Sequence, residues 1–141
     1  MATMIITQCL KSYDINAYDH NGWTPLYFTV IYEEPEFCRL LCERGDVYVY
    51  KGDKNSGDTA LHFAACHGRM ECMRILLYVG KANVDAKDNR SNTSLHYAAS
   101  RGHIEAATLL IERGAEINPI NEYNRTPLDR AHNNHHTALP F

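Results

Sequence analysis

The chain has 141 residues, a length that fits one folded core, and its 14 Lys and Arg against 17 Asp and Glu give a net charge of −3. This balance provides no basic stripe for phosphate backbones, so we expect no direct nucleic-acid partner. The sequence has no apolar run near the roughly 18 residues of a membrane span and no signal-peptide pattern in residues 1–15. We therefore expect no membrane contact and a cytoplasmic or nuclear location.

The first predicted element is a helix over residues 3–12. These residues run into Asp14-Ile15-Asn16, which matches the end of a later unit of the chain. Residues 3–12 therefore have the pattern of the second helix of a unit whose first helix is missing.

Four short phrases that each begin with Thr follow, and they divide the rest of the chain into units. The phrases start at Thr24, Thr59, Thr93 and Thr126, at steps of 35, 34 and 33 residues. The outer two read Thr-Pro-Leu, and the inner two read Thr-Ala-Leu-His and Thr-Ser-Leu-His. Repetition at this period is typical of a solenoid of stacked supersecondary units.

Each phrase predicts the start of a short first helix. A Thr before a helical run is an N-cap because its hydroxyl accepts a backbone N–H, and Pro suits the next position. Alanine pairs in the second and third units keep this helix thin enough for close stacking, and Gly68 and Gly102 end it. Glu33, followed by Pro35, stands at this position in the first unit. We therefore expect a differently built turn there.

A second, leucine-rich helix follows in three units and ends at a glycine placed 21 residues after the threonine, namely Gly45, Gly80 and Gly114. The finger-like segment after it turns through Gly22 or Gly57, two positions before the next Thr, as a tight turn with positive φ requires. Ser91 and Asn124 replace this glycine later, which predicts local strain. The alternation of residues 47–50, Val-Tyr-Val-Tyr, predicts a strand.

Finger, helix, turn and helix, with such a phrase at about a 33-residue period, resembles the ankyrin repeat over residues 3–137. The resemblance implies an all-α ankyrin-repeat solenoid of helix-turn-helix units with β-hairpin-like fingers, in a single domain over residues 1–141. We expect about four repeats, the outer ones partial or divergent, with the boundaries 3–18, 19–53, 54–87, 88–120 and 121–141. Two interpretations of the ends stay open, natural half-repeat caps or a fragment of a longer array.

The resemblance also implies that His62 and His96 bond the phrase threonine and the neighbouring finger. Tyr27 and Asp129 replace them in the outer units, so those fingers lose one tie. Nothing in the sequence matches a nucleophile, phosphate-loop or metalloprotease pattern, so we expect no enzyme.

The five cysteines fit buried, reduced thiols, and we expect no metal and no cofactor. Two alternatives are metal sites. The first uses Cys66, either with His67 and Cys72 or with His62. The second uses the C-terminal His132, His135 and His136.

In ankyrin arrays the fingertips and the exposed face of the first helices form a concave binding surface. The resemblance therefore implies a protein-binding module, an adaptor or inhibitor, with another protein as its partner. The variable positions, carried over one by one, give the candidate contacts Asn21, Trp23, Ile31, Tyr32, Asp58, His67, Arg90, Asn92, Arg101, Tyr123 and Arg125. For Trp23 the alternative is packing on the next finger.

Aromatic residues gather on the first repeat and arginines on the third and fourth, and both are typical of interface hot spots. This distribution suits a partner that is apolar at one end and acidic at the other. A second functional interpretation is a recognition arm of a larger enzyme, channel or ubiquitin-ligase receptor. We expect a monomer, with weak self-association at most.

One further family pattern concerns modification. Leu110 with Glu116-Ile117-Asn118 looks like the pattern that asparaginyl hydroxylases modify in ankyrin repeats, with Asn118 as the acceptor. The alternative is that asparagine merely suits a finger turn.

Overall fold

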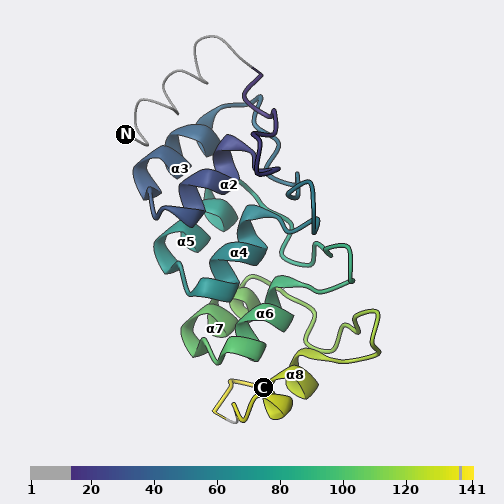
Figure 1. The fold of residues 1–141 in the computed structure, drawn as a ribbon. Helices are drawn as coiled ribbons and strands as arrows, with labels where there is room; N and C mark the ends of the chain where they lie inside the picture. The colour runs from purple at the N-terminus through teal and green to yellow at the C-terminus, as the bar shows by residue number, and fades with distance from the viewer. Residues whose placement is uncertain (1–13, 137) are drawn as a thin grey trace.

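The computed structural model describes residues 14–136 and 138–141, and within these ranges every regular element is a helix. The predicted helix over residues 3–12 lies outside the described residues. The helices, labelled as in Figure 1, are α2 (Pro25–Ile31), α3 (Pro35–Glu43), α4 (Ala60–His67), α5 (Met70–Tyr78), α6 (Ser94–Arg101), α7 (Ile104–Glu112) and α8 (Pro127–Asn133). The predicted all-α solenoid class is confirmed. None of these helices has the length and apolar character needed to cross a bilayer.

The helices form two rows. Helices α2, α4, α6 and α8 pack in sequence along one row, and α3, α5 and α7 pack along the other. Figure 1 shows the pairs stacked in a column, with the loops that join consecutive pairs all projecting to one side. Neighbouring helix pairs therefore bury their apolar faces against each other, and α8 packs on α6 at the end of the stack. The largest buried side chains of this core include Val30, Leu41, Leu61, Met73, Leu76, Leu95 and Leu110.

The four phrase threonines are N-caps, as predicted. The hydroxyl of each accepts the backbone N–H three residues later, at Tyr27, His62, His96 and Asp129. The alanine pairs of α4 and α6 are fully buried, which lets these helices approach closely.

The turn between the two helices of a unit is left-handed in the first three units. Gly68 has φ 65° and Gly102 has φ 69°, and Glu33 in the first unit has φ 51°. The backbone N–H of Glu34 reaches Thr29 O there, as that of Arg69 reaches Ala64 O in the next unit. The expectation of a differently built first turn is therefore wrong, because Glu33 adopts the conformation that glycine has elsewhere.

The glycines after the second helices follow the helix ends, as predicted, but their backbones differ. Gly114 has φ 87°, whereas Lys81 rather than Gly80 is left-handed after α5, with φ 55°. Position 80 requires glycine for a steric reason, because a Cβ there would lie 2.9 Å from Leu76 O and 3.0 Å from Cys42 Sγ.

The predicted strand at residues 47–50 is wrong. Val47 and Val49 pack against the core while Tyr48 and Tyr50 are exposed, with their rings stacked 5.4 Å apart. The backbone N–H of Lys51 bonds Tyr48 O and closes a turn. The alternation therefore reflects which side chains are buried, and it does not reflect pairing with a neighbouring strand.

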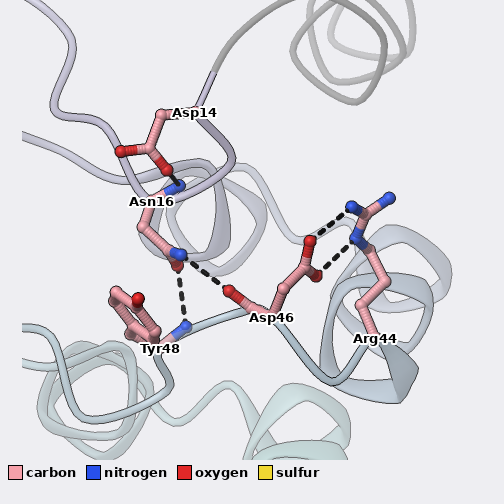
Figure 2. Close-up of polar contacts among 5 residues, drawn as sticks. All are labelled: Asp14, Asn16, Arg44, Asp46 and Tyr48. Atoms are coloured by element: carbon pink, nitrogen blue, oxygen red, sulfur yellow. Dashed lines mark hydrogen bonds and ion pairs between the residues drawn. The ribbon is translucent and has the colours of Figure 1, made fainter.

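Asn16 fastens the first described residues to the first unit. Its Nδ2 donates to Asp46 O and its Oδ1 accepts the N–H of Tyr48, both at 2.7 Å, and Figure 2 shows this bridge. Asp14 Oδ1 accepts the N–H of Asn16, and Arg44 holds the Asp46 carboxylate with two nitrogens. The side chain of Asn16 therefore links the backbone of the loop after α3 to the first described residues.

Candidate partner-binding surface

Four fingers project from the stack, and one backbone hydrogen bond closes each. These bonds run from Asp19 N to Trp23 O, Asp53 N to Asp58 O, Asp88 N to Asn92 O and Asn121 N to Arg125 O. Neighbouring fingertips are joined by backbone bonds from Lys54 N to Gly22 O, Asn89 N to Ser56 O and Glu122 N to Arg90 O, and side-chain amides add further bonds between them. The fingers thus form one continuous edge along the solenoid.

A carboxylate or amide at the start of each finger folds the tip, and the sequence analysis missed it. Asp88 Oδ1 accepts the N–H groups of Arg90 and Asn92, each at 2.9 Å. The same role falls to Asp19, Asp53 and Asn121. An Asp or Asn stands five residues before the phrase threonine in three units, so this spacing was a usable signal.

Two buried histidines tie the third and fourth fingers to the first helix of the preceding unit. His62 Nδ1 accepts the N–H of Thr59 at 3.0 Å, and its Nε2 donates to Asn92 O at 2.9 Å. His96 bridges Thr93 and Arg125 in the same way. Burial lowers the pKa of both imidazoles. The predicted structural role is confirmed.

The outer units differ from each other at this position. Asp129 Oδ2 accepts the N–H of Thr126 at 2.9 Å, so the fourth unit keeps the capping bond that we expected it to lose. Tyr27 makes no such bond, and its ring lies 5.5 Å from Phe63 and 6.2 Å from Trp23. The first unit therefore replaces a polar tie with aromatic packing.

The face of the first helices beside the fingers carries two rows of side chains, four and eight residues after each threonine. The first row is Phe28, Phe63, Tyr97 and Arg130, and the second is Tyr32, His67, Arg101 and Asn134. The rings of Phe28 and Tyr32 lie 4.4 Å apart and are tilted by 36°, whereas those of Phe63 and His67 are stacked 4.1 Å apart. In α8, Arg130 and Asn134 both donate to Ser100 Oγ. We call the fingers and these two rows together the finger-side surface.

The chemistry of the finger-side surface changes along the stack. We define the aromatic half by Phe28, Tyr32, Phe63 and His67, and the arginine half by Arg90, Arg101, Arg125 and Arg130. The ion pairs found within residues 14–136 and 138–141 are Arg44–Asp46, Arg69–Glu33 and Arg74–Glu105, so none uses the arginine half.

The predicted contact residues fall into three classes of exposure. Asn21, Tyr32, His67, Arg90, Arg101, Tyr123 and Arg125 are exposed. Ile31, Asp58 and Trp23 are half-buried, and Trp23 packs on the core. Asn92 is only 4% exposed, so its expected place at an exposed tip is wrong. The reason is that its carbonyl oxygen bonds His62 and its side chain accepts from Asn121 at 2.9 Å.

Phe28, Phe63, Tyr97 and Arg130 belong to the finger-side surface but were absent from the predicted contacts. Their common position, four residues after the threonine, was visible in the repeat register. The residue type at this position changes from Phe to Tyr to Arg along the chain, and such variation at one repeat position indicates a surface contact position.

Two carboxyl groups meet at the base of the second and third fingers. The hydroxyl of Tyr97 lies 3.1 Å from Asp58 Oδ1 and also hydrogen-bonds Asp88 Oδ2. Burial and the neighbouring Asp88 raise the pKa of Asp58 to about 7. Burial acts against the charge of Asp88 too, but hydrogen bonds from Asp58, Tyr97 and backbone N–H groups lower its pKa. Below about pH 7, Asp58 is therefore the member of the pair that holds a proton.

The cysteines and histidines considered for metal binding do not converge. Across the part of the chain that the structure describes, no three His, Cys, Asp or Glu side chains are grouped to hold a metal ion. His67 stacks on Phe63, and the ring of His136 covers Gly102, where a Cβ would lie 2.6 Å from its Nδ1. Cys38, Cys42 and Cys72 are buried between the helices, and Cys66 is half-buried.

Comparison with known proteins finds one matching family model and several similar proteins, two of which are described here. A model of the family described as ankyrin repeats (3 copies) matches residues 2–88 and 77–140. The tyrosine-protein kinase HTK16 of Hydra vulgaris is 36% identical over 64 residues, which cover 45% of this chain and 8% of that protein. The putative ankyrin repeat protein FPV034 of fowlpox virus (strain NVSL) is 25% identical over 129 residues, which cover 92% of this chain and 30% of that protein. The chain thus spans under a third of either relative.

Proposed function

The chain belongs to the ankyrin-repeat family, whose stacked units present extended binding surfaces, and on this premise we propose that it binds a partner protein through its finger-side surface. It is a protein–protein interaction module. In this proposal it acts without catalysis, as an adaptor or inhibitor, and holds its partner rigidly. The free thiols of Cys38, Cys42, Cys66 and Cys72 suit a reducing compartment, the cytoplasm or the nucleus.

One observation carries the proposal, the division of the finger-side surface into an aromatic half and an arginine half. Tyr32 is 54% exposed and rests on Phe28, so its ring is held in place at little further loss of side-chain freedom. The arginine half has charges that no carboxylate neutralises in the described part of the chain. Rigid aromatic groups and unpaired arginines are the residue types that dominate protein interfaces.

Capture from a cell lysate with surface variants tests this function. The variants are Tyr32→Ala with His67→Ala on the aromatic half, and Arg101→Gln with Arg125→Gln on the arginine half. Tyr78→Ala is the matched control, because Tyr78 is also a well-exposed tyrosine, 47% against 54%, and lies on α5 in the other helix row. Circular dichroism checks that all variants fold equally.

We expect quantitative mass spectrometry to find one partner that the wild type and Tyr78→Ala retain and both double variants lose. Retention by both double variants together with loss in Tyr78→Ala would move the binding site to the other helix row and refute the proposal.

The alternative is that these residues are the recognition arm of a larger protein whose activity lies elsewhere. It draws support from the Hydra relative, a tyrosine-protein kinase of which this chain matches 8%. The mass of the natural polypeptide separates the two cases. A natural product of 16.1 kDa agrees with the first proposal, and a much larger one agrees with the alternative.

Hydroxylation of Asn118 stays a prediction. The residue is exposed in the loop after α7. Asn16, at the matching position of the first unit, is 6% exposed and hydrogen-bonded to Asp46 and Tyr48 in the loop after α3. Of these two asparagines, an enzyme therefore reaches Asn118 more readily. An increase of about 16 Da confined to the peptide that contains Asn118 is the expected result, because one oxygen is added to the side chain.

A further inference from the structure

A cavity of about 310 Å³ lies on the arginine half, between the second, third and fourth fingers and helices α6 and α8. The residues that define it here are Ser56, Asp88, Arg90, Tyr97, Tyr123 and Arg130, and we call it the Arg130 pocket. Ligand pockets for whole small molecules span on the order of 300–1,000 Å³. The Arg130 pocket is at the small end of this range, so it suits a single side chain better than a cofactor.

The guanidinium of Arg130 is poorly satisfied within the protein. Its Nη1 lies 3.4 Å from Asn92 Oδ1 and its Nη2 lies 3.3 Å from Ser100 Oγ, and both acceptors are neutral. Good N–H···O bonds are about 2.9–3.0 Å long, and a guanidinium has five N–H donors. Arg130 therefore keeps most of its hydrogen-bonding capacity, and its charge, for another group.

Asp88 also lines the pocket, yet it does not neutralise Arg130. One of its oxygens accepts the N–H groups of Arg90 and Asn92, and the other accepts from Tyr97. Both oxygens are thus already committed to the finger and to α6. Arg90, an exposed arginine, also lines the pocket and adds a second positive charge near it. A group that enters the pocket therefore meets the positive charges of Arg90 and Arg130, and the carboxylate of Asp88, whose oxygens already accept hydrogen bonds from the protein.

From this geometry we infer that the Arg130 pocket binds the carboxylate of an Asp or Glu side chain from an acidic segment of a partner protein. The inference rests on the proposed protein-binding function and specifies the partner's chemistry at one end of the surface. A carboxylate matches the planar fork of a guanidinium with two parallel hydrogen bonds. Tyr123, which is 59% exposed, stands beside the pocket and can cover the backbone of such a segment.

The test uses hexaglutamate, capped at both ends, as the probe, with hexaglutamine as the neutral reference. The side-chain Nε–Hε signal of Arg130 is followed by NMR while either peptide is added to the full chain. The variants are Arg130→Gln, which removes the charge, Arg130→Lys, which keeps the charge but loses the fork, and Arg39→Gln as the control. Arg39 is an exposed arginine on α3, in the other helix row.

We expect hexaglutamate to shift the Arg130 signal saturably and hexaglutamine to leave it unchanged. Arg130→Gln should weaken hexaglutamate binding roughly tenfold or more, since charge-assisted bonds are about twice as strong as neutral ones. Arg130→Lys should fall between, and Arg39→Gln should stay within about twofold of the wild type.

Equal weakening by Arg130→Gln and Arg39→Gln would show diffuse attraction and overturn the inference. So would the absence of a saturable shift up to about 10 mM peptide. Thermal unfolding of each variant separates loss of binding from loss of folding. If a lysate partner is lost with Arg101→Gln and Arg125→Gln but is indifferent to Arg130→Gln, the proposed function stands and this inference alone fails.

Discussion

At the scale of single residues, the finger turns need a left-handed backbone whatever residue occupies them. Gly22 and Gly57 have φ of 80° and 73°, and Ser91 and Asn124 have φ of 62° and 59°. A left-handed backbone costs a residue with a Cβ roughly 1–2 kcal/mol, and less for asparagine, whose side chain tolerates it. Ser91 therefore carries strain that the other three turns largely avoid.

Ser91→Gly should raise the free energy of unfolding by about 0.5–1 kcal/mol, because the relief of strain exceeds the added chain entropy of glycine. Urea denaturation measures this change. Asn124→Gly is the matched comparison and should change stability by less, about 0.5 kcal/mol at most. A loss of stability in Ser91→Gly would mean that the serine side chain contributes more than its backbone costs.

The carboxyl pair of Asp58 and Asp88 makes the stability depend on pH. The pKa of Asp58 is about 7 in the folded protein against an ordinary value of 3.8. Between these values the unfolded chain releases a proton that the folded chain retains, so stability falls as the pH rises from about 4 to about 7. The cause is burial of Asp58 beside a second carboxylate.

Asp58→Asn should therefore gain stability relative to the wild type as the pH rises, with the largest difference above pH 7. Asparagine mimics the protonated acid, because it carries no charge and its amide N–H₂ can donate to Asp88 or to the hydroxyl oxygen of Tyr97. Urea denaturation of both proteins at pH 5 and pH 8.5 gives the difference. Glu122→Gln, a change at an exposed carboxylate in the fourth finger, should show no such pH dependence.

At the scale of elements, the histidine ties join each first helix to the next finger. A proton on His62 Nδ1 would face the N–H of Thr59, which already donates to that atom. Burial, which disfavours the charged imidazolium, lowers the pKa values of His62 and His96 below their ordinary value of 6.5. A histidine with a lowered pKa gives stability that is present above the unfolded pKa and is lost as the pH falls through it.

We expect the free energy of unfolding to decline below about pH 6.5 through these two residues. The double variant His62→Gln, His96→Gln should lose much of this decline, because glutamine caps a helix in the same position without titrating. His67→Gln is the control, since His67 is exposed. A double variant as sensitive to acid as the wild type would assign the decline to other groups.

Features that act within one unit could be predicted from the sequence. The threonine caps, the positive φ of the finger turns and the alanine contacts all follow from residue type and spacing, and the role of His62 followed from the family resemblance. These features are local, so short-range patterns determine them.

Features that depend on a neighbouring unit could not be predicted. Asn92 is buried because Asn121, in the next finger, bonds to it. Glu33 has a left-handed backbone, and its carboxylate pairs with Arg69 of the next unit. Arg130 lines a pocket that forms only when neighbouring fingers are stacked beside it. In each case the deciding contact comes from residues about 30 positions away.

At the scale of the whole molecule, stability is shared only between neighbours. Helix α6 contacts α4, α7 and α8, whereas α2 contacts α3 and α4. In such a stack the total stability is close to a sum of unit stabilities and nearest-neighbour interfaces. Damage to one unit should therefore spread to adjoining units and fade with distance.

Leu95→Ala tests this expectation. Leu95 is 1% exposed in α6, so its truncation should cost roughly 3 kcal/mol. Hydrogen exchange under native conditions should then rise most in α6, α7 and α8, less in α4 and least in α2. The gradient arises because α8 packs mainly on α6, whereas α2 packs on α3 and α4 and is linked to α6 only through α4.

Leu40→Ala provides the control for this experiment, because Leu40 is 52% exposed on α3 and its truncation should cost less than about 0.5 kcal/mol. An equal rise of exchange in every helix of Leu95→Ala would mean that the stack opens only as one cooperative unit. A graded rise instead means that the arginine half, which lies on α6, α8 and the last two fingers, can loosen while the aromatic half stays folded. The two halves of the finger-side surface would then differ in rigidity as well as in chemistry, and a partner that binds both would stabilise the weaker end.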